Sequence, residues 1–435
     1  MPYTERRGDG EYPWRVRWLI PGETTAAGKP KYDSASGFAD EDTARDYGLD
    51  MESDIRRGKY RGRRDDMTFE RWALGVWFPA YSRKRRPTTI AARRNDLINH
   101  LAPGFGHLPL GDINWWAVTQ WADAQTCAKS STAMRVSLLG QILTAAVDAS
   151  KLESNPVAGR RLYGASRRRI ADKAFPEPWQ VRQIAERFTE YGALYAQHDG
   201  RPVRSYAIST RYAQMYRVLV YALGWTGMRS GEAHALTRER CGLWRRDIVD
   251  GQPWRRRVLV VDPDEGSLTR YYDPAQRKNV PSLGKPKSQA GAREIDLPPF
   301  LCDMFDEHLD GWEHERLFCE PDGTAFKRNT FARYLRIVSD GRAGRPARAG
   351  WPAVPEWAPI VPGLTPHGFR HGHYTWLREE GAPDVMVDDR IGHEGRGMGG
   401  VYAHPTPAMR KRVVDALQRR YEDAVGPGDA LRDSA

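Results

Sequence analysis

The sequence predicts a mainly helical protein with small β-sheets, divided into separately folded units. Apolar side chains recur at helical spacing over long stretches, whereas short stretches near the N-terminus and in the C-terminal half alternate apolar and charged residues, as half-exposed strands do. The chain has 435 residues, against roughly 100–200 residues for one domain. Two or three domains are therefore expected.

The first 64 residues predict a small α+β unit. Residues 11–20 alternate tryptophan and valine with arginine, which is the period of a half-exposed strand. Residues 23–36 carry turn residues and predict a second strand. Residues 40–58 begin with acidic side chains, which stabilise the positive end of a helix dipole, and predict a helix.

Residues 67–159 predict a compact unit of four helices. Thr68 can cap the first helix, and Thr88 or Thr89 can start the second. The third covers residues 115–121, and a longer fourth helix follows. The positions expected on buried faces are Leu97, Ile98, Leu101, Met134, Leu138, Leu139, Ile142 and Ala146, together with a tryptophan cluster of Trp72, Trp77, Trp115, Trp116 and Trp121.

Residues 170–425 form the largest block and predict helices around short strands. Helices are expected near 178–188, 215–223, 300–309, 328–338, 367–379 and 407–423, and strands at 255–261 and 292–297. Two further stretches are interpreted as insertions. Residues 262–284 are rich in charged and turn residues, and residues 340–362 are rich in Pro, Gly and Ala.

Positive charge is concentrated near the boundaries of these units. The chain has 67 Lys and Arg against 56 Asp and Glu, a net charge of +11. Clustered basic side chains favour contacts with nucleic-acid phosphates over a role in solubility alone. The candidates for such contacts are Arg56, Arg57, Lys59 and Arg61 in a first cluster, Arg83, Lys84, Arg85 and Arg86 in a second, and Arg167, Arg168 and Arg169 in a third.

The composition argues against several classes of protein. No stretch approaches the roughly 18 uninterrupted apolar residues of a membrane span, and the N-terminal residues lack the apolar segment of a signal peptide. The 4 cysteines form no CxxC pair, so neither a disulfide scaffold nor a cysteine-rich zinc site is expected. We expect a cytoplasmic protein with no membrane contact, metal or cofactor.

Four segments carry residues that can act on a phosphate group. They are TGMRSGE at 226–232, KPKSQAGARE at 285–294, HGFRH at 367–371 and IGHEGRGMGGVYAH at 391–404. Arginine forks bind phosphate oxygens, lysine or histidine can protonate a leaving oxygen, and tyrosine can be a covalent nucleophile. Any one of these residues alone would more often be an ordinary structural or surface group.

In this order, the segments resemble the signature boxes of the tyrosine recombinase or phage integrase family. The matching positions are Arg229 with the acidic Glu232 three residues on, His367 and Arg370 in the His-x-x-Arg box, His393 in the Ile-Gly-His box, and the nucleophile position Tyr402 nine residues later. The resemblance is strong over 205–423, moderate over 67–159 and weak over 1–60. The neighbouring His371, His373, Tyr374 and His404 are interpreted as structural or supporting residues.

The resemblance leaves two candidates for the catalytic lysine. In the family this lysine precedes a strand of the pattern Arg-x-Ile-x-Leu, which residues 292–298 (AREIDLP) match. Lys285 and Lys287 both qualify, and Lys287 is favoured because a serine follows it, as in the family's Lys-Thr/Ser step. Its distance in sequence from Arg229 is longer than is usual in the family, and the insertion at 262–284 accounts for the excess.

The resemblance also implies a mechanism. Tyr402 would attack a DNA phosphate held by Arg229 and Arg370, giving a 3′-phosphotyrosyl intermediate without ATP or a metal ion. Lys287 would protonate the departing 5′ oxygen, and the two histidines would hydrogen-bond the phosphate or accept the phenolic proton. Two rounds of cleavage and rejoining would recombine two DNA sites.

The implied organisation has three parts: an arm-type DNA-binding domain at 1–64, a helical core-binding domain at 67–159 and a mixed α/β catalytic domain at 170–425. The implied partners are double-stranded attachment sites, a homotetramer on DNA, and an excisionase or host DNA-bending protein. The helix at 407–423 is a candidate for docking on a neighbouring protomer. The basic N-terminal unit favours an integrase of a phage or other mobile element, acting in the cytoplasm of a bacterial or phage-infected cell.

Two other functions are considered. A type IB topoisomerase-like nicking-closing enzyme would use the same chemistry, but the N-terminal unit and the four-helix unit argue against it. A non-catalytic DNA-binding regulator would not need the complete set of active-site residues. Site-specific recombination is the favoured function.

Overall fold

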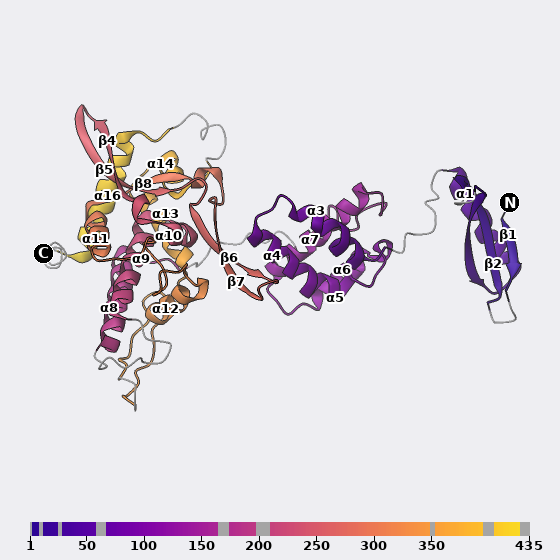
Figure 1. Cartoon of the computed structure of the whole chain (residues 1–435), viewed down its shortest axis with the longest axis horizontal. Coiled ribbons are helices and arrows are strands. Elements are labelled where there is room, and N and C mark those ends of the chain that lie inside the picture. Colours follow the sequence, from indigo (N-terminus) through magenta and orange to yellow (C-terminus); the bar gives the residue numbers. More distant parts are fainter. Residues whose placement is uncertain are drawn as a thin grey trace. The chain divides into compact units, whose positions relative to one another are not determined.

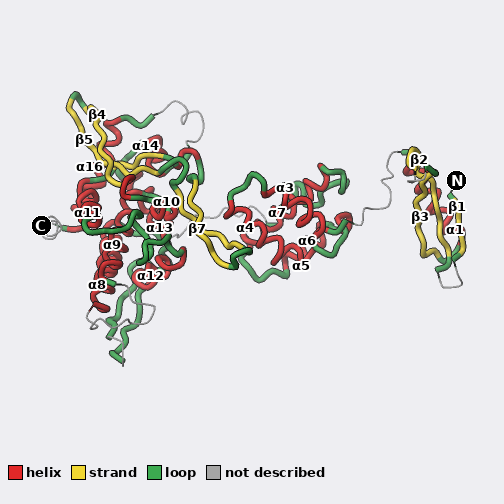
Figure 2. Tube along the Cα trace, in the orientation of Figure 1, coloured by secondary structure: helices red, strands yellow, loops and turns green. Residues whose placement is uncertain are grey.

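The computed structural model describes residues 2–7, 12–24, 28–57, 67–163, 174–196, 209–348, 353–394 and 404–426. Contacts divide the chain into two units, Met1–Arg167 and Arg168–Ala435. Helices make up most of the described chain, and its strands form three small antiparallel sheets (Figures 1 and 2). The predicted fold class, mainly helical with small sheets, is confirmed.

The N-terminal residues form a three-stranded sheet with one helix. The elements are β1 (Tyr3–Arg6), β2 (Trp14–Thr24), β3 (Pro30–Phe38) and α1 (Glu41–Arg56), and the strand order is β1-β2-β3. Strand β1 was not among the elements expected from residue patterning. The core is small and contains Val16, Trp18 and Ala44. Gly48 lets α1 approach the sheet closely, because a Cβ there would lie 2.6 Å from Val16 Cγ2.

Residues 67–163 contain the four predicted helical stretches. The elements are α2 (Phe69–Trp72), η1 (Ala73–Trp77) and α3 (Phe78–Ser82); α4 (Pro87–Asp96), η2 (Leu97–Leu101) and α5 (Ala102–Phe105); η3 (Leu110–Asp112); α6 (Trp115–Asp123); and α7 (Lys129–Asp148). Thr68 caps the first stretch, as expected, by accepting a hydrogen bond from the Arg71 N–H. The second stretch begins at Pro87, whose fixed φ suits the first helical position, rather than at either threonine.

Some positions expected in this core are exposed instead. Trp116 is 72% exposed and Met134 is 59% exposed, while Ile98 lies in the π-helical turn η2 and is 37% exposed. Successive residues on a helix point about 100° apart, so Trp115 and Trp116 cannot both face one core. A π turn also breaks the 3.6-residue period from which Ile98 was placed. The remaining expected positions are buried or pack against the core.

The C-terminal unit surrounds a three-stranded sheet with helices. Its elements are α8 (Pro178–Ala196), α9 (Thr210–Thr226), α10 (Ser230–Ala235), η4 (Arg238–Arg240), β4 (Cys241–Val249), β5 (Gln252–Val261), β6 (Ser267–Asp273), β7 (Lys278–Gly284), η5 (Gln289–Gly291), β8 (Arg293–Asp296), α11 (Pro299–Leu309), α12 (Arg328–Asp340), α13 (Pro366–Glu379), α14 (Asp384–Ile391) and α16 (Pro407–Val425). The sheet order is β4-β5-β8, and β6 and β7 form a separate hairpin. Strands β4, β6 and β7 and helix α14 were not expected.

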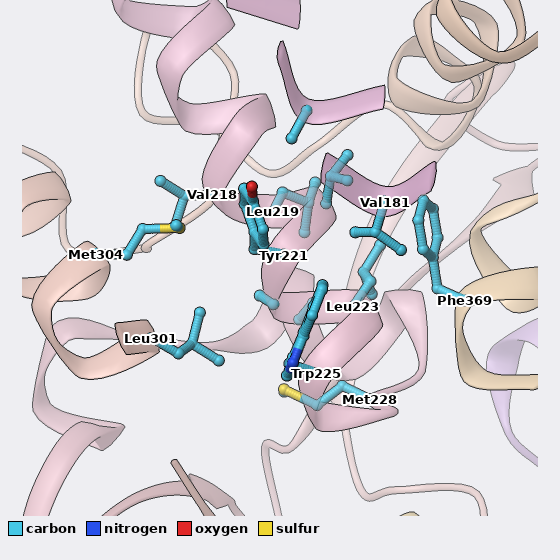
Figure 3. Close-up of a cluster of buried hydrophobic side chains, with 14 of the residues drawn as sticks. Val181, Val218, Leu219, Tyr221, Leu223, Trp225, Met228, Leu301, Met304 and Phe369 are labelled. Atoms are coloured by element: carbon cyan, nitrogen blue, oxygen red, sulfur yellow. The ribbon is translucent and has the colours of Figure 1, made fainter. Parts of the chain in front are cut away.

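Helix α9 is the centre of this unit. Every residue from Val218 to Thr226 is buried, so the C-terminal half of α9 is enclosed on all sides by other elements. Figure 3 shows its Leu219 and Leu223 among side chains of other segments, including Val181, Leu301 and Phe369. Because the last turn of α9 leads directly into the TGMRSGE segment, a helix end that is enclosed in the core positions the first predicted site residue.

The apolar face of α16 belongs to the same core. Leu417 and Tyr421 are buried, the Tyr421 ring stacks on Phe300 with centroids 3.7 Å apart, and the Trp225 indole donates to the Leu417 carbonyl at 3.1 Å. The expectation that this face docks on a neighbouring protomer is therefore wrong for this structure, since the same face packs within the chain. Helical spacing identified the apolar face but not what covers it.

Both predicted insertions form extended pairs. Residues 262–284 include the β6–β7 hairpin, whose Leu268 is buried and whose base contacts α10. Within 340–362, the bridge pairs Arg342–Trp357 and Arg345–Val354 hold two segments together. In the described part of the chain, no helix is both long and apolar enough to cross a membrane.

Replacing Leu417 with alanine is expected to lower the free energy of unfolding by about 2–5 kcal/mol, because it leaves a cavity in a fully buried position. Denaturant unfolding measures this. The control Arg419→Ala, on the exposed side of the same helix, should change it by less than about 0.5 kcal/mol. Equal effects of the two changes would contradict the packing of α16 within the chain.

Candidate active site

Arg229 is placed by a left-handed glycine. Helix α9 ends at Gly227, whose φ of +64° lies in the region that favours glycine. A Cβ on Gly227 would lie 2.6 Å from His373 Cδ2, so space also requires glycine. The chain then turns through Met228 to Arg229, which stands at the N-terminus of α10. A helix end and a sharp turn therefore determine where this guanidinium lies.

A buried carboxylate holds Arg229 in place. Glu232 accepts from the Arg229 backbone N–H at 3.0 Å and from its Nη1 at 2.8 Å, and its second partner, Arg293 Nη2, lies at 3.0 Å. The Glu232 side chain is only 1% exposed. Burial alone would raise the pKa of this carboxyl, but Arg293 and Arg229 outweigh burial and lower it. Glu232 is thus an anion between two cations.

Arg370 is a buried cation of the site whose guanidinium is only partly satisfied. It lies on α13, is 4% exposed, and donates from Nη1 to the Gly227 carbonyl at 2.8 Å. Its Nη2 is buried and has no hydrogen-bond partner among the described residues. Burial and the nearby charge of Arg229 lower the pKa of Arg370 to about 9. A buried donor without a partner, beside a second arginine, is a place where an anion would be strongly stabilised.

His393 joins the two arginines from a third element. Helix α14 ends at Gly392, another left-handed glycine with φ +66°, and the Gly392 carbonyl accepts from Arg229 Nη2 at 3.4 Å. The His393 N–H donates to the Asp388 carbonyl at 2.9 Å. Burial, Arg370 and Arg229 together lower the pKa of His393. The imidazole is therefore neutral at pH 7 and can donate or accept a hydrogen bond.

His367 lies on the same helix as Arg370. The two residues are three positions apart on α13 and so share one face. The His367 side chain is exposed, and its ring contacts the His371 ring edge-on with centroids 4.7 Å apart. The structure thus brings Arg229, Arg370 and His393 together and places His367 one helical turn from Arg370.

The two candidate lysines are exposed, and neither contacts this cluster through a hydrogen bond or ion pair in the described chain. Both follow β7 on the segment that leads into β8, and both are exposed. Lys285 forms an ion pair with Asp264 at 3.1 Å. Among the described residues, Lys287 makes no hydrogen bond or ion pair with Arg229, Arg370 or His393.

Several predicted residues lie outside the described chain. These are Tyr402, Lys59, Arg61, Arg167, Arg168 and Arg169. The other predicted DNA-contacting residues, Arg56, Arg57, Arg83, Lys84, Arg85 and Arg86, are all exposed. Among the supporting residues, His373 is fully buried, whereas Tyr374 and His404 are exposed.

Residue patterning missed two buried arginines. Arg293, at the start of β8, donates to Glu232, to the Arg390 carbonyl at 2.7 Å and to the Gly291 carbonyl at 2.8 Å. Arg390, the residue before the Ile-Gly-His box, is 1% exposed and bonded at all three guanidinium nitrogens. Their positions beside recognisable motifs were the available signal, but arginine is usually expected at the surface.

The chain is similar in sequence to proteins named as prophage integrases. The chain is 26% identical over 340 residues to the putative prophage phiRv2 integrase of Mycobacterium tuberculosis, covering 77% of this chain and 74% of the relative. It is 21% identical over 358 residues to the prophage ps2 probable integrase of Lactococcus lactis, covering 79% and 81%. The chain is therefore similar to prophage integrases, which agrees with its resemblance to the tyrosine recombinase, or phage integrase, family. No family model matches it.

The fold of this chain also resembles that of a solved structure. A structure of the Tn1549 transposon integrase in complex with transposon right end DNA matches with a TM-score of 0.51 and 16% identity. The match covers 83% of this chain and 100% of that one. At this identity the likeness concerns the fold.

Replacing Glu232 with glutamine should lower the free energy of unfolding by about 3–5 kcal/mol, because it removes the anion that compensates buried Arg293. Denaturant unfolding tests this. The matched control is Glu239→Gln, an exposed glutamate shortly after α10, which should change stability by less than about 0.5 kcal/mol. An E232Q protein as stable as the control would show that the carboxylate charge is not required.

Proposed function

We propose that this chain is a tyrosine recombinase, a site-specific DNA integrase that cleaves and rejoins DNA through a 3′-phosphotyrosyl intermediate. The observation that supports it best is the pairing of Arg370, whose buried Nη2 has no partner in the described chain, with Arg229, which Glu232 holds beside it. Two fixed guanidiniums can bind both non-bridging oxygens of one phosphodiester, where negative charge develops during transfer.

Tyr402 is proposed as the nucleophile. Its phenolic oxygen attacks the phosphorus, a new P–O bond forms to tyrosine, and the bond to the 5′ oxygen breaks. The phenolic proton passes to a base, for which His367 or neutral His393 is suited, and Lys287 donates a proton to the departing 5′ oxygen. The phosphotyrosyl bond conserves the energy of the broken bond, so rejoining to another 5′ hydroxyl requires no ATP.

The same proposal assigns DNA contacts to the other parts of the chain. Residues 1–64 would bind arm-type sites, residues 67–159 would bind the core site, and residues 170–425 would carry out catalysis. The exposed basic segment at 83–86 would contact the phosphate backbone, together with the predicted clusters at 56–61 and 167–169. Binding through so many cations should weaken steeply as salt is raised.

Assembly and cellular setting follow from the same proposal. A homotetramer would hold two duplexes, so that the 5′ hydroxyl released from one can attack the phosphotyrosine of the other. An excisionase or a host DNA-bending protein would set the direction of the reaction. The protein would act on DNA in the cytoplasm, during integration and excision of a phage or other mobile element. Neither a topoisomerase-like enzyme nor a non-catalytic regulator is favoured by the relatives.

Lys287→Ala is expected to slow strand cleavage by at least about 100-fold, because the alkoxide leaving group then departs unprotonated. A substrate with a 5′-bridging sulfur, which needs little protonation, should restore the rate. Lys285→Ala is the matched control and should cleave the ordinary substrate nearly as fast as wild type. If Lys285→Ala is instead the slow variant that sulfur rescues, Lys285 is the acid.

Tyr402→Phe should bind core-site DNA with unchanged affinity but form no covalent adduct, because only one oxygen is lost and the ring remains. A nicked suicide substrate, denaturing electrophoresis and peptide mapping test this, with Tyr374→Phe as the control that should still form the adduct. Wild-type adduct should map to Tyr402 and should persist with a chelator present. An adduct in the Tyr402→Phe protein, or one that requires magnesium, would contradict the mechanism.

A further inference from the structure

Four segments that carry site residues meet at one buried pair, Arg390 and His373. Arg390 lies on α14, just before His393, and His373 lies on α13, one turn after Arg370. Arg390 Nε donates to His373 Nε2 at 3.0 Å. Both side chains are enclosed, with relative exposures of 1% and 0%. A buried arginine bonded to a buried histidine is a costly arrangement unless all their polar atoms are satisfied.

Every side-chain nitrogen of this pair has a hydrogen-bond partner, and the partners lie on the segments that carry site residues. Arg390 Nη2 donates to the Trp225 carbonyl in the last turn of α9 at 2.8 Å, and Nη1 donates to the Asp296 carbonyl of β8 at 2.9 Å. His373 Nε2 accepts from Arg390, so the ring proton is on Nδ1, which donates to the Gly224 carbonyl at 2.9 Å. Two side chains therefore connect α9, α13, α14 and β8.

The pair is connected to both catalytic arginines by short chains of contacts. The His373 ring fills the space beside Gly227, and the Gly227 carbonyl in turn accepts from Arg370. On the other side, the Arg390 carbonyl accepts from Arg293, which pairs with Glu232 and thus with Arg229. Arg390 is thus connected to Arg370 through its side chain and His373, and to Arg229 through its backbone carbonyl, Arg293 and Glu232.

We infer that Arg390, acting through His373, is a positioning residue that sets the spacing of Arg229, Arg370 and His393 around one phosphate. The inference rests on the proposed function for the identity of that phosphate. Burial and the charge of Arg390 lower the pKa of His373 well below its usual value, which keeps the ring neutral and able to accept. Both side chains are enclosed by protein, so the loss of either should affect the rate of chemistry more than DNA binding.

The test compares Arg390→Leu with Arg257→Leu. Arg257 is a suitable control because its side chain is only 13% exposed, it lies on β5 next to β8, and it bonds Asp306 and the Gly242 carbonyl rather than any site residue. Adduct formation on a suicide substrate, at saturating protein and below the unfolding temperature, should be at least about 100-fold slower in R390L, the scale of effect that misplacement by about 1 Å can produce. DNA affinity should stay within about 3-fold, and R257L should change neither quantity by more than about 3-fold.

Variants at His373 keep the test informative even where R390L folds poorly. His373→Gln places an amide oxygen that can accept from Arg390 Nε and should retain cleavage within about 10-fold. His373→Leu leaves Arg390 without that acceptor and should be as slow as R390L. A purely structural role predicts instead that the cleavage rate falls in proportion to the unfolding temperature across all variants. Equal cleavage rates for H373Q and H373L would overturn the inference.

Binding of orthovanadate, a phosphate mimic, separates this inference from the proposed function. Titration calorimetry at low salt should show at least about 10-fold weaker vanadate binding in R390L than in wild type and R257L. If wild type binds vanadate but never forms an adduct, the recombinase mechanism fails while the positioning role stands. If R390L binds vanadate as tightly as wild type does, the positioning role fails whatever the adduct assay shows.

Discussion

The candidate active site depends on one buried carboxylate, Glu232, held between Arg229 and Arg293 at 2.8 Å and 3.0 Å. Removing two such charges from water is costly, and the cost is offset only where the geometry is good and further hydrogen bonds satisfy the remaining atoms. Glu232 meets this condition, because it also accepts the Arg229 backbone N–H. The carboxylate therefore sets both the backbone turn and the guanidinium of the same residue, which connects the end of α9 to the start of β8.

The rest of the site has an excess of buried positive charge. Arg293, Arg370 and Arg390 are all under 10% exposed, and Arg370 has no carboxylate partner in the described chain. Its lowered pKa reports an environment that disfavours the cation until an anion arrives. A bound phosphodiester would satisfy the unpartnered Nη2 and offset the repulsion from Arg229. The same feature that destabilises the free protein thus supplies affinity for charge that develops during phosphoryl transfer.

Local patterns in the sequence predicted several of the helices and three of the site residues. Residues whose role depends on contacts between distant segments were not predicted. Helical spacing placed α9, α13 and α16, and the short motifs identified Arg229, Arg370 and His393, because both depend on neighbouring residues. Arg293 and Arg390 were not predicted, since their partners lie between 2 and 165 positions away and no periodic pattern marks a buried arginine. Trp116 was wrongly placed in a core because tryptophan is an apolar residue type, whereas its position on α6 faces away from the core.

Two glycines show how helix ends are used to arrange the site. Gly227 and Gly392 end α9 and α14 in the left-handed conformation, where a side chain would be strained and would also collide with His373 or Arg293. Each glycine carbonyl accepts from an arginine of another segment: Gly227 from Arg370, and Gly392 from Arg229. The sharp turns therefore do more than redirect the chain. They aim two carbonyls at two guanidiniums, so that the ends of packed helices, rather than long loops, determine where a phosphate would bind.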